Sequence, residues 1–298
     1  MDTDFNLVEK DILLAAEGDA NSGFRTKNDP GAVYRSEVID RGETLMTQAR
    51  IKYIANGTLN PNKDLATLLV FEFEFVNHSP NQSRRFKAAD ITLRFENLKP
   101  ESGTSLEVYR IAPSNQYSFS KTTRKREVSH TVSAGIQIGG AGVVTPEAGY
   151  EYGVSEEKIS EHAIRIAGSM YMTSPHNNRR NTVRWTLSEN SHIKGGIPSL
   201  VRCAVLLKRP LGAVLRTTVR VETDVDFFTS ARKFFGRERL DDVDPIDIDP
   251  DLAYPEDLSE ESVEISNLEK LDLLKYAFFV KEGSVDQNRF TAIEPDKL

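Results

Sequence analysis

The residues of this chain that could do chemistry are few and widely spaced. Its histidines include no pair at the H-x-x-x-H spacing of a helical metal site. The chain also lacks the G-x-S-x-G elbow of serine hydrolases, the P-loop and the G-x-G-x-x-G dinucleotide fingerprint. The sequence therefore identifies no catalytic residue, and it predicts no metal site and no cofactor. The five histidines are His78, His130, His162, His176 and His192.

Four aromatic or titratable residues are the best candidates for lining a small-molecule pocket. They are Trp185, Tyr150, Tyr152 and His162. Trp185 lies in a short alternating segment, so packing in the core is its main expected role. An enzyme or ligand binder with a pocket in a β body, acting for example in secondary metabolism, is one alternative that these residues leave open.

Charge is distributed very unevenly along the chain. The net charge is −7, but residues 237–298 alone contain 7 basic and 18 acidic residues. Residues 241–262 hold ten carboxylates, no basic residue and three evenly spaced prolines, which favours an extended, solvated segment. This tail either folds back on a basic face of the body or docks on a basic partner protein. Calcium ligation is a third interpretation, although the EF-hand order is absent. The acidic candidates are Asp241, Asp242, Asp244, Asp247, Asp249 and Asp251.

Two basic clusters could receive such a tail. A phosphate-binding role is less consistent with the sequence pI of about 5.4 and with the absence of any nucleic-acid-binding signature. We therefore expect no nucleic-acid partner, and we interpret both clusters as solvated faces or docking surfaces. The first cluster is Lys121, Arg124, Lys125 and Arg126, and the second is Arg179, Arg180 and Arg184.

Most of the chain has the pattern of a mainly β protein. In residues 65–77, for example, Leu69, Phe71, Phe73 and Phe75 alternate with other residues, which is the period of a half-buried strand. About ten such segments, separated by turn residues, predict an antiparallel β-sandwich or a barrel-like body. The expected strands are 46–56, 65–77, 86–96, 106–112, 127–138, 149–159, 162–172, 182–188, 198–207 and 214–225.

The domain organisation expected from these patterns has three parts. Residues 1–45 form a partly ordered N-terminal segment, residues 46–237 the β-rich body, and residues 238–298 the acidic, partly disordered tail. Residues 229–235 favour a short helix, and apolar spacing within 267–280 suggests an amphipathic helix. The lone cysteine, Cys203, lies in an apolar strand and is expected to be buried. With no secretory signal and no membrane-spanning apolar run, a cytoplasmic location is expected.

The most unusual segment is the predicted hairpin at 127–138 and 149–159. Val132, Ile136 and Ile138 alternate with Ser129, Ser133 and Gln137, and a glycine-rich stretch follows. This pattern resembles the membrane-inserting stems of aerolysin-like pore formers, which implies a membrane-active hairpin as a further alternative. The charged residues Glu156, Glu157 and Lys158 interrupt the second strand, so an ordinary exposed hairpin is the main expectation and a membrane role a minor one.

Several segments are also similar to a group of uncharacterised β-rich proteins of filamentous fungi. They are EHAIRIAGS at 161–169, VRWTLSEN at 183–190, KGGIP at 194–198 and DVDPIDIDP at 242–250. This resemblance implies a β fold in a fungal, non-secreted context and supplies no activity. The leading hypothesis from the sequence is therefore a binding or scaffold module, with an acidic tail that docks on the same chain or on a protein partner.

Overall fold

The computed structural model of the protein consists of β-strands and short 3₁₀ turns. It describes residues 37–41, 45–61, 64–78, 85–99, 106–132, 152–173, 179–226, 244–252, 263–281 and 286–290. The strands are β1 (Glu37–Arg41), β2 (Leu45–Thr58), β3 (Leu65–Asn77), β4 (Phe86–Asn97), β5 (Glu107–Ala112), β6 (Asn115–Val132), β7 (Tyr152–Tyr171), β8 (Thr182–Ser188), β9 (Leu200–Lys208), β10 (Leu215–Val225), β11 (Ile246–Ile248), β12 (Phe278–Val280) and β13 (Gln287–Arg289). The 3₁₀ turns are η2 (Leu268–Lys270) and η3 (Leu273–Tyr276).

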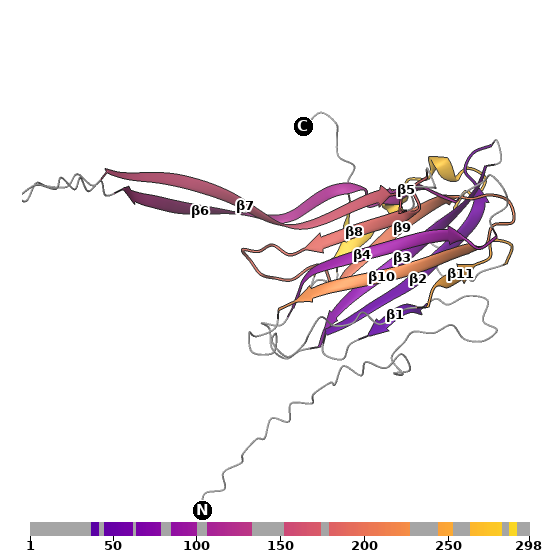
Figure 1. The fold of residues 1–298 in the computed structure, drawn as a ribbon, viewed down its shortest axis with the longest axis horizontal. Coiled ribbons are helices and arrows are strands. Elements are labelled where there is room, and N and C mark those ends of the chain that lie inside the picture. The colour runs from indigo at the N-terminus through magenta and orange to yellow at the C-terminus, as the bar shows by residue number, and fades with distance from the viewer. Residues whose placement is uncertain are drawn as a thin grey trace, which may run out of the picture.

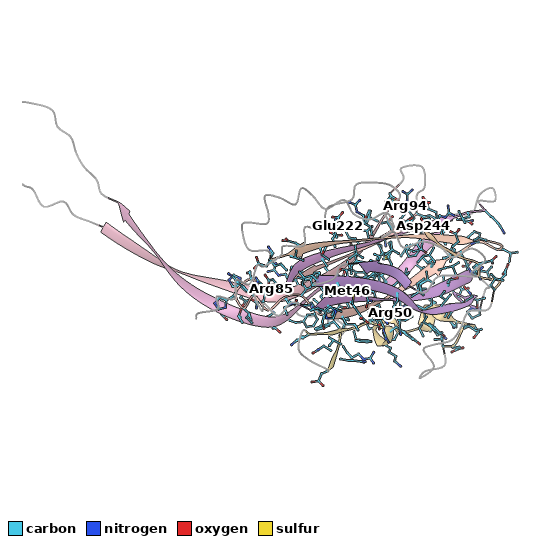
Figure 2. The ribbon with its side chains drawn as sticks, turned by 90° about the horizontal axis from the view of Figure 1, so that it is seen from below. Met46, Arg50, Arg85, Arg94, Glu222 and Asp244 are labelled. Atoms are coloured by element: carbon cyan, nitrogen blue, oxygen red, sulfur yellow. The ribbon has the colours of Figure 1, made fainter. Side chains whose placement is uncertain are left out.

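These strands form two antiparallel sheets that pack face to face. One sheet, called sheet A here, has the order β1-β2-β3-β9-β12-β13, with β5 on the same edge of β9 as β12. The other, sheet B, has the order β11-β10-β4-β8-β7-β6. Figure 1 shows β4, β8 and β10 lying over β2, β3 and β9, and Figure 2 shows the same two layers from another side. The body is therefore an open β-sandwich rather than a closed barrel.

The alternating strands place large apolar side chains between the sheets. Phe71 and Phe73 of sheet A are fully buried, as are Leu93 and Phe95 of sheet B. The ring of Phe75 packs edge-on against that of Phe86, with centroids 5.5 Å apart, and so joins the two sheets. Because alternate residues of a strand point to opposite faces, the predicted period of two accounts directly for this core.

The predicted strands agree with the observed ones, with two differences in the longest pair. β3 and β8 occupy the expected residues, and Cys203 is buried in β9 as expected. The two expected segments 149–159 and 162–172 are one continuous strand, β7, and β6 begins at Asn115, before its expected start. The expected helix at 229–235 and most of residues 1–45 lie outside the described residues, although β1 falls within that N-terminal segment.

The C-terminal region contributes to both sheets, so the boundary expected at residue 237 does not mark the end of the β body. β11 pairs with β10 in sheet B, and β12 pairs with β9 in sheet A. The expected helix at 267–280 is wrong, since η2, η3 and β12 occupy this range. The spaced apolar residues of this range, such as Leu268 and Leu273, instead pack against the sandwich. The guanidinium of Arg110 fixes the first turn, because Nη2 donates to the carbonyls of Leu268, Glu269 and Leu271.

Turn η3 contacts β9 and β5, and this contact accounts for the uninterrupted apolar sequence in the second half of β9. Cys203, Ala204, Val205, Leu206 and Leu207 of β9 are all buried, although alternate residues face opposite sides of the sheet. A strand covered on both sides is expected to be apolar at every position. The uninterrupted apolar run at 203–207 is consistent with this environment. Within the described residues no helix is long and apolar enough to cross a bilayer.

Candidate functional site

Strands β6 and β7 form a two-stranded ribbon that extends well beyond the sandwich (Figure 1). β8 pairs with β7 over Arg165–Tyr171, and among the described residues the preceding part of β7 pairs with β6 alone. The distal ribbon is defined here as residues 122–132 of β6 and residues 152–162 of β7. Two-stranded ribbons are at best marginally stable in water, because they have no third strand and no second layer to cover them. A projecting ribbon of this length is therefore a candidate for function.

The register of the distal ribbon separates its residues into two faces. Val132 lies opposite Tyr152 and Thr122 opposite His162, so every opposed pair consists of two even-numbered or two odd-numbered residues. Opposed residues of an antiparallel pair share a face, and successive residues alternate. The even face and the odd face are named accordingly. Near the end of the ribbon farther from the body, the even face carries Val128, His130, Val132, Tyr152 and Val154, and the odd face carries Ser129, Thr131, Gly153 and Ser155.

Charged residues fill the part of the ribbon nearer the body. The even face has Arg124 and Arg126 on β6, with Glu156 and Lys158 on β7, which gives three basic residues and one acidic residue. The odd face has one basic residue and three acidic residues, namely Lys125, Glu127, Glu157 and Glu161. The register also opposes Arg126 to Lys158 and Glu127 to Glu157, and like charges directly opposite each other destabilise a ladder. The two faces therefore differ in polarity and in the sign of their charge.

A buried asparagine fixes the ribbon where it leaves the sandwich. At this point β6 has a bulge between Phe119 and Thr122, and Asn190 lies beside it, 1% exposed. Asn190 Nδ2 donates to the carbonyl oxygens of Ser120 at 2.8 Å and His162 at 3.2 Å, and so links the two strands. Nδ2 also lies 3.0 Å from Thr122 Oγ1. One side chain thus satisfies the carbonyl that the bulge frees from the ladder.

The loop after β8 holds this asparagine in place. Asn190 Oδ1 accepts hydrogen bonds from the amides of His192 at 2.9 Å and Ile193 at 3.2 Å. The neighbouring Glu189 forms a bidentate ion pair with Arg85 (Nε–Oε2 2.7 Å, Nη2–Oε1 3.0 Å), and this hydrogen bonding raises the pKa of the Arg85 guanidinium. Figure 2 labels Arg85 at the end of the body from which the ribbon leaves. Charge-assisted bidentate pairs are geometrically specific, so the loop is a firm support.

The structure does not bring the four pocket candidates together. Trp185 is fully buried between the sheets, and its indole Nε1 donates to the carbonyl of Pro113 at 2.9 Å. His162 lies at the base of the ribbon, with Nδ1 2.8 Å from Ser191 Oγ, and Tyr152 lies on the distal ribbon. Tyr150 is outside the described residues. A cavity of about 150 Å³ adjoins Asn190, but none of these residues lines it.

The two basic clusters lie in different parts of the molecule. Arg124, Lys125 and Arg126 belong to the distal ribbon, and the exposed Lys121 lies in the bulge at its base. Arg184, in contrast, forms an ion pair with Asp90 on the outer side of sheet B, and Arg179 pairs with Glu107 of β5. Two of the three arginines of the second cluster are therefore paired with neighbouring carboxylates. The backbone carbonyl of Arg180 accepts a hydrogen bond from the amide of Val108.

Part of the acidic tail also contacts the body. Asp247 of β11 forms a bidentate pair with Arg216 of β10, with both N–O distances at 2.8 Å. Burial lowers the pKa of Arg209, and the nearby charges of Asp251 and Asp249 oppose that shift. Asp244 lies two residues before the start of β11, and Asp241 and Asp242 lie outside the described residues. Among the described residues, no three His, Cys, Asp or Glu side chains are grouped to hold a metal ion.

Sequence reasoning identified the hairpin but missed the residue that anchors it. Asn190 is separated by 70 residues from Ser120 and by 28 from His162, so no local pattern reports their contact. The start of β6 was also missed, although Tyr117 and Phe119 pack on the core there, because the charged residues at 121–126 break the alternation of apolar side chains. The burial of Asn190 and its contacts with both strands can be recognised only when the long-range strand pairing is known.

Comparison with known proteins gives no family for this chain. No family model matches it, and no curated protein matches it. Among solved structures it is similar to one titled "Pore forming protein", with a TM-score of 0.27, 8% identity, and coverage of 63% of this chain and 84% of that chain. It is also similar to the Clostridium perfringens NetB toxin in the membrane-inserted form, with a TM-score of 0.21, 7% identity, and coverage of 62% and 86%. Both TM-scores are too low to transfer a fold or a function.

Proposed function

We propose that this protein acts on lipid bilayers and that its distal ribbon is the segment that enters them. The observation that carries this proposal is the register of β6 and β7, which gives the outer part of a projecting ribbon one apolar face and one face of small polar residues. Strands that span a bilayer show this alternation, with one side toward lipid and the other toward water. The sandwich then serves as the support from which the ribbon extends.

The length of the alternating segment is consistent with this role. In the sequence, the even-numbered positions of β6 from Val128 onward remain mainly apolar as far as Ile138, although residues after Val132 lie outside the described range. That span is 11 residues, counted from 128 to 138. A tilted strand needs about 9 to 11 residues to cross the hydrocarbon core. On β6 the charged residues up to Glu127 precede this span, and on β7 Glu156 lies opposite Val128 at its beginning, so these residues set the depth to which the ribbon enters.

The test is release of an encapsulated dye from liposomes by the full chain and by two matched variants. Val132→Asp places a carboxylate on the even face, and Thr131→Asp places the same group one residue away on the odd face. A charge facing lipid is costly, whereas a charge facing water is tolerated. We expect the unmodified chain and Thr131→Asp to release dye and Val132→Asp to lose most of this activity. The thermal unfolding midpoint of each variant is measured to check that it is folded.

Two outcomes count against the proposal. Absence of dye release by the unmodified chain at high protein concentration removes it. Equal loss in both variants shows that the faces are not distinguished, and the ribbon then does not insert as a two-faced strand pair. The alternatives of a docking tail and of an enzyme with a pocket in the β body stay predictions. The pair between Asp247 and Arg216 is consistent with a tail that folds back on the body, and it identifies no partner protein.

A further inference from the structure

The even face of the distal ribbon changes character along its length. The part farther from the body carries Val132 opposite Tyr152 and His130 opposite Val154, and the part nearer the body carries Arg126 opposite Lys158. Arg124 adds a further basic residue on this face, and Glu156 is its one acidic residue within the distal ribbon. On the even face, apolar residues at the far end are therefore followed, toward the body, by basic residues that suit the charged surface of a membrane.

The opposition of Arg126 and Lys158 is unfavourable unless an anion lies near both. Like charges at directly opposed positions destabilise a ladder, and among the described residues no third strand pairs with this part of the ribbon. The diagonal neighbour Glu156 offsets only part of the positive charge on this face. Headgroups of anionic lipids offer the missing negative charge at the level where the apolar span ends. The odd face, with three acidic residues, is unsuited to the same ligand.

We propose that Arg124, Arg126 and Lys158 form a belt that binds anionic lipid headgroups while the distal even face enters the hydrocarbon below them. This inference rests on the proposed membrane function and specifies the lipid class that the protein prefers. The partner is the phosphate-bearing surface of a bilayer rather than an acidic protein, because the apolar residues on the same face require a hydrocarbon phase beyond the charge. The belt also fixes how far the ribbon can descend.

The experiment measures binding of the full chain to phosphatidylcholine vesicles with and without phosphatidylserine, by flotation, at low and at physiological ionic strength. The unmodified chain should bind vesicles that contain phosphatidylserine more tightly, with the difference shrinking as salt increases. Arg126→Gln removes one charge from the even face, and the matched variant Lys125→Gln removes one from the odd face. Arg126→Gln should weaken binding to anionic vesicles about fivefold, whereas Lys125→Gln should change it less than twofold.

Each result separates this inference from the proposed function. Dye release that is equal from both vesicle types, with no lipid preference in binding, overturns the belt and leaves membrane insertion standing. Preferential binding to anionic vesicles without dye release supports the belt and removes insertion. Equal weakening by Arg126→Gln and Lys125→Gln shows that total charge rather than the even face controls binding, and this overturns the belt. Substituting phosphatidylglycerol for phosphatidylserine should preserve the preference, since both headgroups carry a net negative charge and phosphatidylcholine carries none.

Discussion

The two halves of the β6–β7 pair have the same backbone ladder and very different surroundings. In the half within the sandwich, β8 provides a third strand and the aromatic rings of Tyr117 and Phe119 pack with Phe279 and Phe290 of the C-terminal segment. In the distal ribbon neither strand has a third partner among the described residues, and like charges oppose each other. β7 is therefore paired on both edges in the inner half and, among the described residues, with β6 alone in the distal ribbon, so strand pairing, burial and charge all contribute to the difference in stability.

This contrast shows how one hairpin can serve two purposes. The inner half is built into the core of the body, and Asn190 ties its outer limit to the loop after β8. Within the part of the chain that the structure describes, the distal ribbon has an unpaired edge on each strand, and its register opposes like charges. A segment that must change its surroundings is better kept outside the most stable part of a fold, because its rearrangement then does not require global unfolding.

The largest loss of stability should come from adding a side chain at Gly168 of β7, where the backbone lies very close to Pro113 and Trp185. A Cβ at Gly168 would lie 2.1 Å from the carbonyl oxygen of Pro113 and 2.8 Å from Trp185 Nε1, and neither can move cheaply. We expect Gly168→Ala to destabilise the protein by about 3 kcal/mol or more, measured by chemical denaturation. The control is Gly195→Ala, whose nearest neighbour is 3.6 Å away and which should stay within about 0.5 kcal/mol. Similar values for both would contradict the importance of this contact.

Truncating one side chain in each half tests the comparison directly. Tyr117 is 9% exposed, and its ring lies 4.9 Å from that of Phe290. Tyr117→Ala should cost about 3 kcal/mol of unfolding free energy, since it leaves a cavity in an aromatic cluster. Val128→Ala in the distal ribbon should cost less than about 0.5 kcal/mol in solution. A large loss from Val128→Ala, seen in the thermal midpoint, would mean that the ribbon packs on another surface.

The anchor between the halves can be weakened with one isosteric change. Asn190→Asp keeps the acceptor for the amides of His192 and Ile193 but removes the donor to Ser120 and His162. A buried side chain that loses the two hydrogen bonds donated by Nδ2 and gains a carboxylate should lower the free energy of unfolding by about 2 kcal/mol. Amide hydrogen exchange should accelerate on both strands at the base of the ribbon. Unchanged exchange there would show that Asn190 does not hold the strands, and Ser191→Ala serves as a mild control.

The smallest effect should come from correcting the charge register on the odd face. Glu157→Lys would place a basic residue opposite Glu127 and should stabilise the distal ribbon by about 0.2–1 kcal/mol. The double variant Glu127→Lys with Glu157→Lys restores an opposition of like charges and should return hydrogen exchange of the ribbon amides to the original rate. If the two variants protect these amides equally, the opposed carboxylates do not limit the stability of the ribbon.

Most of the sandwich could be predicted from sequence, because strands with one buried face alternate visibly. Phe71 and Phe73 alternate with the carboxylates Glu72 and Glu74, and this pattern alone fixes β3 and its inner face. The C-terminal segment was misjudged for a physical reason. Spacing of apolar residues by three and four occurs in helices, but it also suits a chain that touches a sheet at intervals. Arg110 binds three carbonyls in this region that a continuous helix would use internally.

The candidate site was only partly predictable, since its features depend on pairing. The alternation of Val132 with Ser129 in the hairpin was visible, but the assignment of Lys158 and Arg126 to one face required the register of β6 with β7. A shift of one residue between the strands would have mixed the faces completely. The role of Asn190 likewise depends on three segments meeting.

The acidic odd face also has a consequence for the movement of ions. If water fills the space on that side of an inserted ribbon, Glu127, Glu157 and Glu161 outnumber Lys125 along it. Rings of carboxylates in a pore attract cations and exclude anions. Any conductance that depends on this ribbon should therefore carry mainly potassium or sodium rather than chloride, and the sign of the reversal potential in a salt gradient would report which face of the ribbon lines the path.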